Sequence, residues 1–377
     1  MINKTDDYNF EVVADKDSFY DALKELKDNR TWFEVEPKSI SEFNALDSCA
    51  LFADYESAKY NTTAEMLLDT MSGAGMAVTI DGNAYLLRDT AVGDFINRAG
   101  FSCTVSRKIS TERLAALLKE FIDAMNKNIR INFCYGKITA ALSPQYQHVD
   151  EQWLLDKLES FSQLKFRAGF ITCSRVWASY EVTEAKEQLL DEYSKQFVKV
   201  SHLCRMAEPD DITPIIEFST GSSGDNSIIV STFLEHKGVR VKLGQPINII
   251  HKGEVKEKFE SEIRFLYPRF VKDIEVFNKL SEVFLVHPYE VADHVLTEIG
   301  LNKRKYSKYY NKTLNFVSSV KIVTAQDLYW ALSKFTDEMK IDNCSKAEIN
   351  DVVDCLFKLL RLDFKKYDYQ KKVKATA

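Results

Sequence analysis

The chain has few glycines and prolines, no cysteine framework and no long apolar run. Its seven cysteines are scattered, odd in number and never spaced as Cys-x-x-Cys, a pattern typical of a reducing compartment. With 13 Gly and 7 Pro, the sequence excludes collagen-like repeats and long flexible linkers. No uncharged apolar stretch approaches ~18 residues, and the N-terminus lacks an apolar segment. We therefore expect a cytoplasmic protein without a membrane span.

Apolar residues make up 45% of the sequence and aromatic residues 12%, enough to build a large core. A chain of 377 residues favours two packed domains. The net charge is −6, and the first 100 residues hold 9 Lys and Arg against 19 Asp and Glu, which leaves +4 for the remainder. This asymmetry fits either a protein that presents different faces to different partners or an ordinary solvated surface.

Hydrophobic periodicity predicts an α+β fold: a mixed front, a β-rich middle with antiparallel hairpins, and a helical end. Residues 16–27 and 111–125 each place apolar side chains on one helical face. Asp81-Gly82, between two apolar runs, is typical of a tight hairpin turn. We expect three parts: an acidic, helical N-terminal segment (1–75), an α+β core (76–254) and a helical region with a basic, tyrosine-rich stretch (255–377).

Other signals set the expected element boundaries. Strands are predicted over 130–135, 137–142, 166–173, 175–182, 215–218, 228–233 and 239–243. Thr62 with Glu65 predicts a capping box at a helix start. Pro268 is expected to bend one long helix over 255–284. Shorter helices are predicted over 183–198, 288–299, 324–339 and 345–360.

The segment Lys137–Tyr146 (KITAALSPQY), followed by Val149-Asp150 and a helix, resembles a recurring segment of a phage- and plasmid-related family, the domain of unknown function numbered nine-three-two. Further resembling segments follow the family's order: Thr90–Phe101 with the helix from Thr111, Phe218–Gly224 with Ile228–Phe233, His251-Lys252-Gly253 and Thr324–Glu338. The resemblance covers roughly residues 80–340, although the family's Asn-Gly and N-terminal aromatic-Pro signatures are missing. It implies a mobile-element protein in a bacterial host cell and supplies no catalytic residues.

A loop rich in Gly and Ser follows a predicted strand, as a phosphate-binding loop would. Backbone N–H groups around Ser219, Gly221, Ser223 and Gly224 suit contact with a phosphate. No Gly-Lys-Ser/Thr occurs, however, and a strand follows where a nucleotide-binding loop needs a helix. The loop is therefore either a connection between strands or a contact with nucleic-acid phosphate.

No motif predicts a catalytic residue, a metal site or a cofactor. The six histidines lack His-x-x-x-His spacing, and no Gly-x-Ser-x-Gly occurs. His251 beside Lys252 is the one histidine with a candidate role, as part of a nucleic-acid-binding patch; a structural role is the alternative.

The clearest signal of composition lies between Leu301 and Gln326, which contains no Asp or Glu. Cations and tyrosines alternate there, and such a pattern suits phosphate neutralisation and base stacking. The predicted nucleic-acid-binding residues are Lys303, Arg304, Lys305, Tyr306, Lys308, Tyr309 and Tyr310. The alternative is a solvated basic face.

These observations favour a non-enzymatic, mobile-element protein that binds nucleic acid, preferably single-stranded, in replication, recombination or maintenance. Three alternatives stay open. First, the acidic N-terminal segment suits a phage factor that binds a host or defence protein. A second alternative is a metal-dependent nucleic-acid enzyme, because its metal-binding carboxylates need not be close together in the sequence. A third is a virion component. Self-association is compatible with each.

Overall fold

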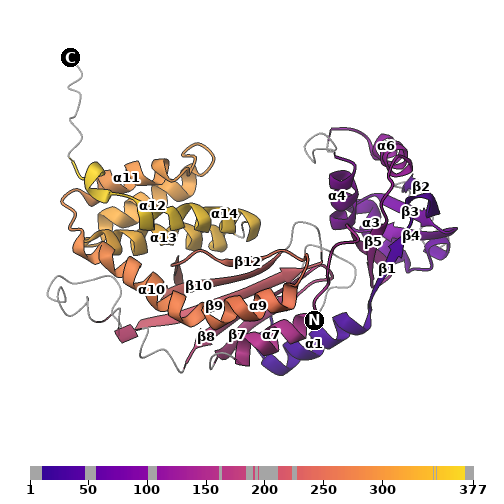
Figure 1. Ribbon diagram of the computed structural model, residues 1–377. Coiled ribbons are helices and arrows are strands. Elements are labelled where there is room, and N and C mark those ends of the chain that lie inside the picture. The colour runs from indigo at the N-terminus through magenta and orange to yellow at the C-terminus, as the bar shows by residue number, and fades with distance from the viewer. Residues whose placement is uncertain are drawn as a thin grey trace, which may run out of the picture.

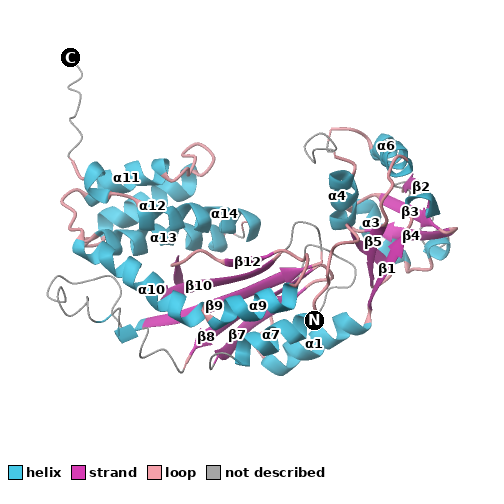
Figure 2. Cartoon of the chain, viewed as in Figure 1, coloured by secondary structure: helices cyan, strands magenta, loops and turns pink. Residues whose placement is uncertain are grey.

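The structure is a computed structural model that describes residues 11–46, 57–100, 108–160, 164–183, 190, 191, 194, 211–222, 227–342, 344 and 346–369. The fold is α+β, as the sequence predicts. Figure 1 shows a small lobe at one end, a separate sheet in the middle and a helical bundle at the other end. Figure 2 shows that the strands gather in two sheets, while the bundle is helical throughout.

The small lobe comprises the described residues between 30 and 142 and is built on a six-stranded sheet. Its strands, in spatial order, are β1 (Arg30–Val35), β5 (Ile129–Cys134), β6 (Lys137–Leu142), β4 (Asn83–Leu87), β3 (Met76–Ile80) and β2 (Ile40–Ala45). Only β4 and β6 pair in parallel. Asp81 and Gly82 connect β3 to β4 with φ angles of 48° and 79°, which confirms the predicted tight turn.

Helices cover both faces of the small-lobe sheet. On one face lie α4 (Asp89–Arg98) and α6 (Thr111–Asp123), whose apolar residues join the sheet in a single core. On the other lies α3 (Ala64–Ser72). This helix begins one residue later than expected: Thr63, not Thr62, is the N-cap, and its Oγ1 accepts a hydrogen bond from the Met66 N–H (3.2 Å).

The central sheet is antiparallel throughout. Its strands are β7 (Leu164–Ile171), β8 (Arg175–Val182), β9 (Ile212–Gly221), β10 (Ile228–His236), β11 (Val239–Lys242) and β12 (Ile247–Ile249). They lie in the order β11-β10-β9-β8-β7. Strand β12 pairs with the first residues of β10, and β11 pairs with its last residues. The predicted antiparallel hairpins are thus confirmed for this sheet.

One face of the central sheet is covered by α1 (Lys16–Asp28), α7 (Glu151–Ser160) and α9 (Val255–Arg264), which lie along it in Figure 1. Apolar side chains of alternate strand positions point to these helices; Phe218 of β9, for example, meets Phe259 of α9 edge-on (6.4 Å between ring centroids). Because successive side chains in a strand point to opposite faces, the intervening residues point to the face away from these helices. We call this second face the open face.

The helical bundle contains α10 (Leu266–Lys279), α11 (Pro288–Glu298), α12 (Ser307–Ser319), α13 (Ala325–Ile341) and α14 (Lys346–Phe357). The helix expected over 255–284 is interrupted close to Pro268, where a bend was predicted, but it forms two helices instead of one. The chain breaks between α9 and α10 at Phe265, and Pro268 lies in the first turn of α10, where its missing N–H costs nothing. Helix α12 was not predicted. Its first turn contains Lys308, Tyr309 and Tyr310 of the basic, tyrosine-rich stretch, whereas the other four residues of the stretch precede the helix.

The lobes do not follow the three expected parts of the chain. The expected helical segment 1–75 also contains β1 and β2, which belong to the small-lobe sheet, whereas α1 packs on the central sheet. The expected core 76–254 therefore spans both sheets. Most of the predicted helix 183–198 lies outside the described residues. No helix in the described part of the chain has the length and apolarity needed to cross a membrane.

Candidate nucleic-acid interface

The tyrosines of the basic stretch are packing residues of the bundle. Tyr310 is fully buried, and its hydroxyl donates to the Asp293 carbonyl (2.7 Å). Tyr306 is 9% exposed and meets Phe335 edge-on (5.9 Å between centroids). Tyr309 is half-buried, with its hydroxyl 3.0 Å from Cys344 Sγ. The base-stacking role expected of these rings is therefore not available to Tyr306 or Tyr310, because a buried ring has no free face.

Carboxylates from neighbouring helices neutralise the lysines of the stretch. Asp293 of α11 pairs with Lys303 (2.8 Å), Asp342 with Lys308 (2.5 Å) and Glu348 of α14 with Lys305 (4.0 Å). Arg304 is exposed in the turn before α12. The stretch is basic along the sequence but nearly charge-balanced in space, so its attraction for phosphate is much weaker than its composition indicates.

His251 has a structural environment. It is 5% exposed, and its ring nitrogens lie 3.1 Å from the Gln147 carbonyl oxygen and 3.2 Å from Thr220 Oγ1. Its ring also packs against Tyr146 (4.8 Å between centroids). Lys252 is exposed, and its backbone bridges to Tyr146. Because both nitrogens of His251 are engaged, the ring joins the loop before α9 to the segment between the two lobes.

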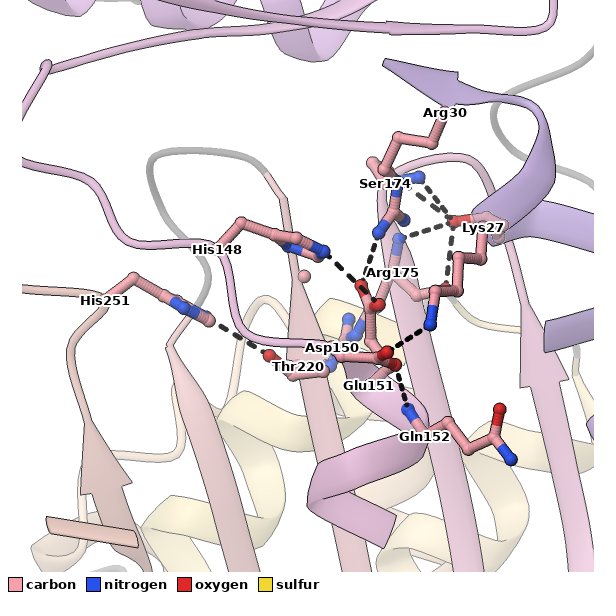
Figure 3. A network of polar contacts seen from close by, with 12 residues as sticks. Lys27, Arg30, His148, Asp150, Glu151, Gln152, Ser174, Arg175, Thr220 and His251 are labelled. Carbon is pink, nitrogen blue, oxygen red and sulfur yellow. Dashed lines mark hydrogen bonds and ion pairs between the residues drawn. The ribbon is translucent and has the colours of Figure 1, made fainter. Parts of the chain in front are cut away.

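Beside His251, a polar network connects the small lobe to the central sheet. Figure 3 shows His148, Arg30 and Glu151 converging, with Lys27 reaching Asp150 next to them (2.5 Å). Glu151 Oε1 accepts from Arg30 Nη1 (2.5 Å), and its other oxygen lies 3.8 Å from His148 Nε2. Burial lowers the pKa of His148 to about 4, and the nearby Glu151 carboxylate only partly opposes this effect.

The Gly/Ser loop leads to a different surface. Ser219 and Gly221 are the described members of the predicted phosphate loop; Ser223 and Gly224 lie outside the described residues. Both described residues end β9, where Gly221 faces Arg175 and Ser219 faces Trp177 across the ladder with β8. The structure thus brings Ser219 and Gly221 beside an arginine and a tryptophan that were not among the predicted site residues.

A transverse row of side chains crosses the open face at this point. The ladder registers align Phe170, Trp177, Ser219, Ile229 and Asn248 on five adjacent strands. Phe170 and Trp177 stack with centroids 5.4 Å apart and planes 19° apart. Ser219 is buried, Trp177 and Ile229 are half-buried, and Asn248 is exposed. The row therefore combines the half-buried ring of Trp177, backed by the buried ring of Phe170, with a hydroxyl and an amide.

Helix α14 forms a wall beside this row. A cavity of about 220 Å³ lies between the open face and the helix. It is lined by residues of the sheet, of the Pro246 turn and of α14: Arg175, Trp177, Glu217, Phe218, Ser219, Ile229, Ser231, Phe233, Lys242, Pro246, Asn248, Asn350, Val353 and Asp354. We call this cavity the sheet groove. Lys242 holds the wall to the sheet through Asp354 (2.6 Å).

Arg175 is the distinctive charge of the sheet groove. Burial lowers the pKa of its guanidinium, and the field of Glu217 only partly opposes this effect. Within the described ranges no carboxylate forms an ion pair with Arg175. Since Glu217 is instead paired with Arg240, Arg175 remains beside Ser219 and Gly221 as a partly desolvated cation that no described carboxylate pairs with.

The far end of the open face has the opposite character. Glu235 binds Arg240 Nε (2.5 Å) and Arg167 (2.8 Å), and Arg240 also pairs with Glu217. These side chains balance each other's charges. Among the described residues of the open face, Arg175 is therefore the favoured position for an anion.

Comparison with known proteins gives no relative: no family model, no curated protein and no solved structure matches this chain. The resemblance to the nine-three-two family stays a prediction. In the described part of the chain, no group of three or more His, Cys, Asp or Glu side chains is placed to hold a metal ion. The interface is thus characterised by its own geometry alone.

Proposed function

We propose that the protein binds single-stranded nucleic acid in the sheet groove, without catalysis of its own. The observation that carries this proposal is Arg175, a partly desolvated guanidinium with no carboxylate partner among the described residues, next to the ring of Trp177 and the hydroxyl of Ser219. A guanidinium suits a phosphate, and an indole suits the face of a base. The proposal keeps the expected partner class and moves the interface from α12 to the open face.

The shape of the groove favours a single strand over a duplex. An unpaired base can stack on a protein ring, whereas a paired base presents only its edge. The α14 wall stands close enough to the sheet for Lys242 and Asp354 to pair across the gap (2.6 Å), and the cavity measures about 220 Å³. This space suits a nucleotide inserted between wall and floor, and it is too small for a duplex. Ser231 and Asn248 offer hydrogen bonds to such a nucleotide without a marked preference for one base.

Photocrosslinking tests the position of the interface. Labelled oligonucleotides that contain 5-iodouracil are irradiated with the protein, and the crosslinked peptides are mapped by mass spectrometry. The proposal predicts crosslinks on β8 at Trp177 and none at Tyr309, and their loss in Trp177→Leu. Crosslinks confined to α12 would restore the site expected from composition. Their absence under conditions in which a known single-strand binder is labelled would contradict the proposal.

A further inference from the structure

A second cavity adjoins the sheet groove on the bundle side. It measures about 310 Å³ and is lined by Lys242, Gln245, Pro246, Asp354, Phe357, Lys358 and Arg361. Lys242, Pro246 and Asp354 line both cavities, so the two are neighbours along one path. The path runs from the open face, past the loop between β11 and β12, to the turn Lys358–Arg361 that follows α14.

Cations dominate this second cavity. Phe357 has Lys242 over its ring (5.8 Å) and Arg361 also over it (5.9 Å). Lys358 and Arg361 are both exposed, and no carboxylate in the described part of the chain forms an ion pair with either. Lys358 Nζ donates hydrogen bonds to the Ile299 carbonyl (3.0 Å) and to Cys355 Sγ (3.9 Å), which fix the amine and leave one N–H group for a ligand. The single acidic lining residue, Asp354, is paired with Lys242.

This composition differs from that of other lysine-rich surfaces of the bundle. On α12, Lys308 and Lys312 each bind a carboxylate of the neighbouring helical segment, Asp342 and Glu338 (2.5 Å each). In the second cavity, by contrast, Lys358 and Arg361 line a concave surface and have no carboxylate partner among the described residues. The ammonium group of Lys358 is held in place, and the guanidinium of Arg361 lies over an aromatic ring. Together they suit a phosphate that carries one or two negative charges.

We infer that Lys358 and Arg361 form a phosphate subsite for the nucleic acid that occupies the sheet groove. The inference rests on the proposed function and adds a direction to it: the bound strand extends from Arg175 on the open face to Arg361 on the bundle. The bound group is a phosphate ester, either an internal diester of a longer strand or a terminal monoester of a short one.

Binding of oligothymidylates of two lengths tests the subsite. Fluorescence anisotropy is measured across a salt series with strands of about 4 and about 12 nucleotides, since single-strand sites span roughly this range. The test variant is Lys358→Ala/Arg361→Ala. The control, Lys308→Ala/Lys312→Ala, removes the same charge from the same bundle but outside the path.

For the long strand, we expect the test variant to bind about 5- to 20-fold more weakly than wild type near 50 mM salt. We also expect its slope of log K against log salt to fall by about 0.7 to 1.4, the value for one or two phosphates. The control variant should stay within about twofold of wild type. Neither variant should change binding of the unphosphorylated short strand, which reaches only the sheet groove.

Adding a 5′- or 3′-phosphate to the short strand separates the two sources of the phosphate. Tighter binding that the test variant abolishes identifies a terminal monoester, whereas an effect confined to the long strand identifies an internal diester. Equal losses in the test and control variants, or no loss in either, would overturn the subsite while leaving the sheet groove in place. Absence of binding by the wild-type protein would instead overturn the proposed function itself.

Discussion

Arg30, at the start of β1, and Glu151, at the start of α7, form a buried ion pair between the two lobes. Arg30 Nη1 lies 2.5 Å from Glu151 Oε1, and 3% and 8% of the two side chains are exposed. The pair joins residues 121 positions apart, beside the segment through which the chain returns from the small lobe to the central sheet. It therefore couples the stability of each lobe to their relative placement.

Replacing one partner of this pair should destabilise the protein strongly. Glu151→Ala leaves the Arg30 charge buried without compensation, and we expect the free energy of unfolding to fall by about 3–5 kcal/mol. Urea denaturation followed by circular dichroism measures the change. The exposed pair Lys38–Glu36 provides the control: Lys38→Ala should leave the free energy of unfolding essentially unchanged, because solvent screens an exposed ion pair. A loss below about 1 kcal/mol for Glu151→Ala would contradict the burial of this pair.

The lowered pKa of His148 makes stability depend on pH. Its folded-state pKa is about 4 against an ordinary value of 6.5, so between these limits the unfolded chain binds a proton that the folded protein does not. The contribution of neutral His148 to the free energy of unfolding is complete above pH 6.5 and is lost as the pH falls toward 4. His148→Phe keeps a ring on Trp32, which His148 stacks against at 5.4 Å, and cannot titrate.

We expect wild-type protein to lose about 2 kcal/mol more than His148→Phe between pH 7 and pH 5. Urea titrations of both proteins at the two pH values measure this difference, and the comparison cancels contributions from His236 and His251, whose pKa values burial also lowers. Equal losses in the two proteins would mean that His148 is protonated in the folded state.

Gly169 allows α1 to approach the central sheet. A Cβ at this position would lie 2.4 Å from Phe19 Cε2, so Gly169→Ala should cost about 1–3 kcal/mol and loosen α1. Gly93 is the matched control, since it lies inside α4 with nothing within 4 Å of its Cβ position. Gly93→Ala should be neutral or stabilise by up to about 1 kcal/mol. Thermal denaturation of both variants tests the contrast, and equal effects would refute the close packing.

The sequence predicts most strands and amphipathic helices because their apolar spacing is local information. The sequence predicts a strand over residues 175–182, which are the boundaries that β8 has. The same alternation places Arg175 and Trp177 on one face. Which face remains open is decided by α1, α7 and α9, and α1 lies far from β8 along the chain. For this reason the sequence alone does not identify Arg175 and Trp177 as site residues.

For the basic, tyrosine-rich stretch, the sequence predicts a binding surface that the fold does not provide. Between Leu301 and Gln326 the chain contains no acidic residue, which indicated a cationic surface. The carboxylates that neutralise it come from helices before and after this segment, so local composition cannot reveal them. Tyr306 and Tyr310 are four residues apart, which is the spacing of one buried helical face. That spacing was the available signal that they belong to the core.

The most direct test of the central claim compares two arginines of the central sheet. Arg175 has no carboxylate partner among the described residues, whereas Arg167 is paired with Glu235 (2.8 Å). Affinity for a fluorescent oligothymidylate of about 12 nucleotides is measured by anisotropy for Arg175→Ala and Arg167→Ala. We predict at least about tenfold weaker binding and a salt slope smaller by about 0.7 for Arg175→Ala, with Arg167→Ala within about twofold of wild type. Wild-type affinity in Arg175→Ala, or a wild-type protein that binds no single strand at low salt, would contradict the account.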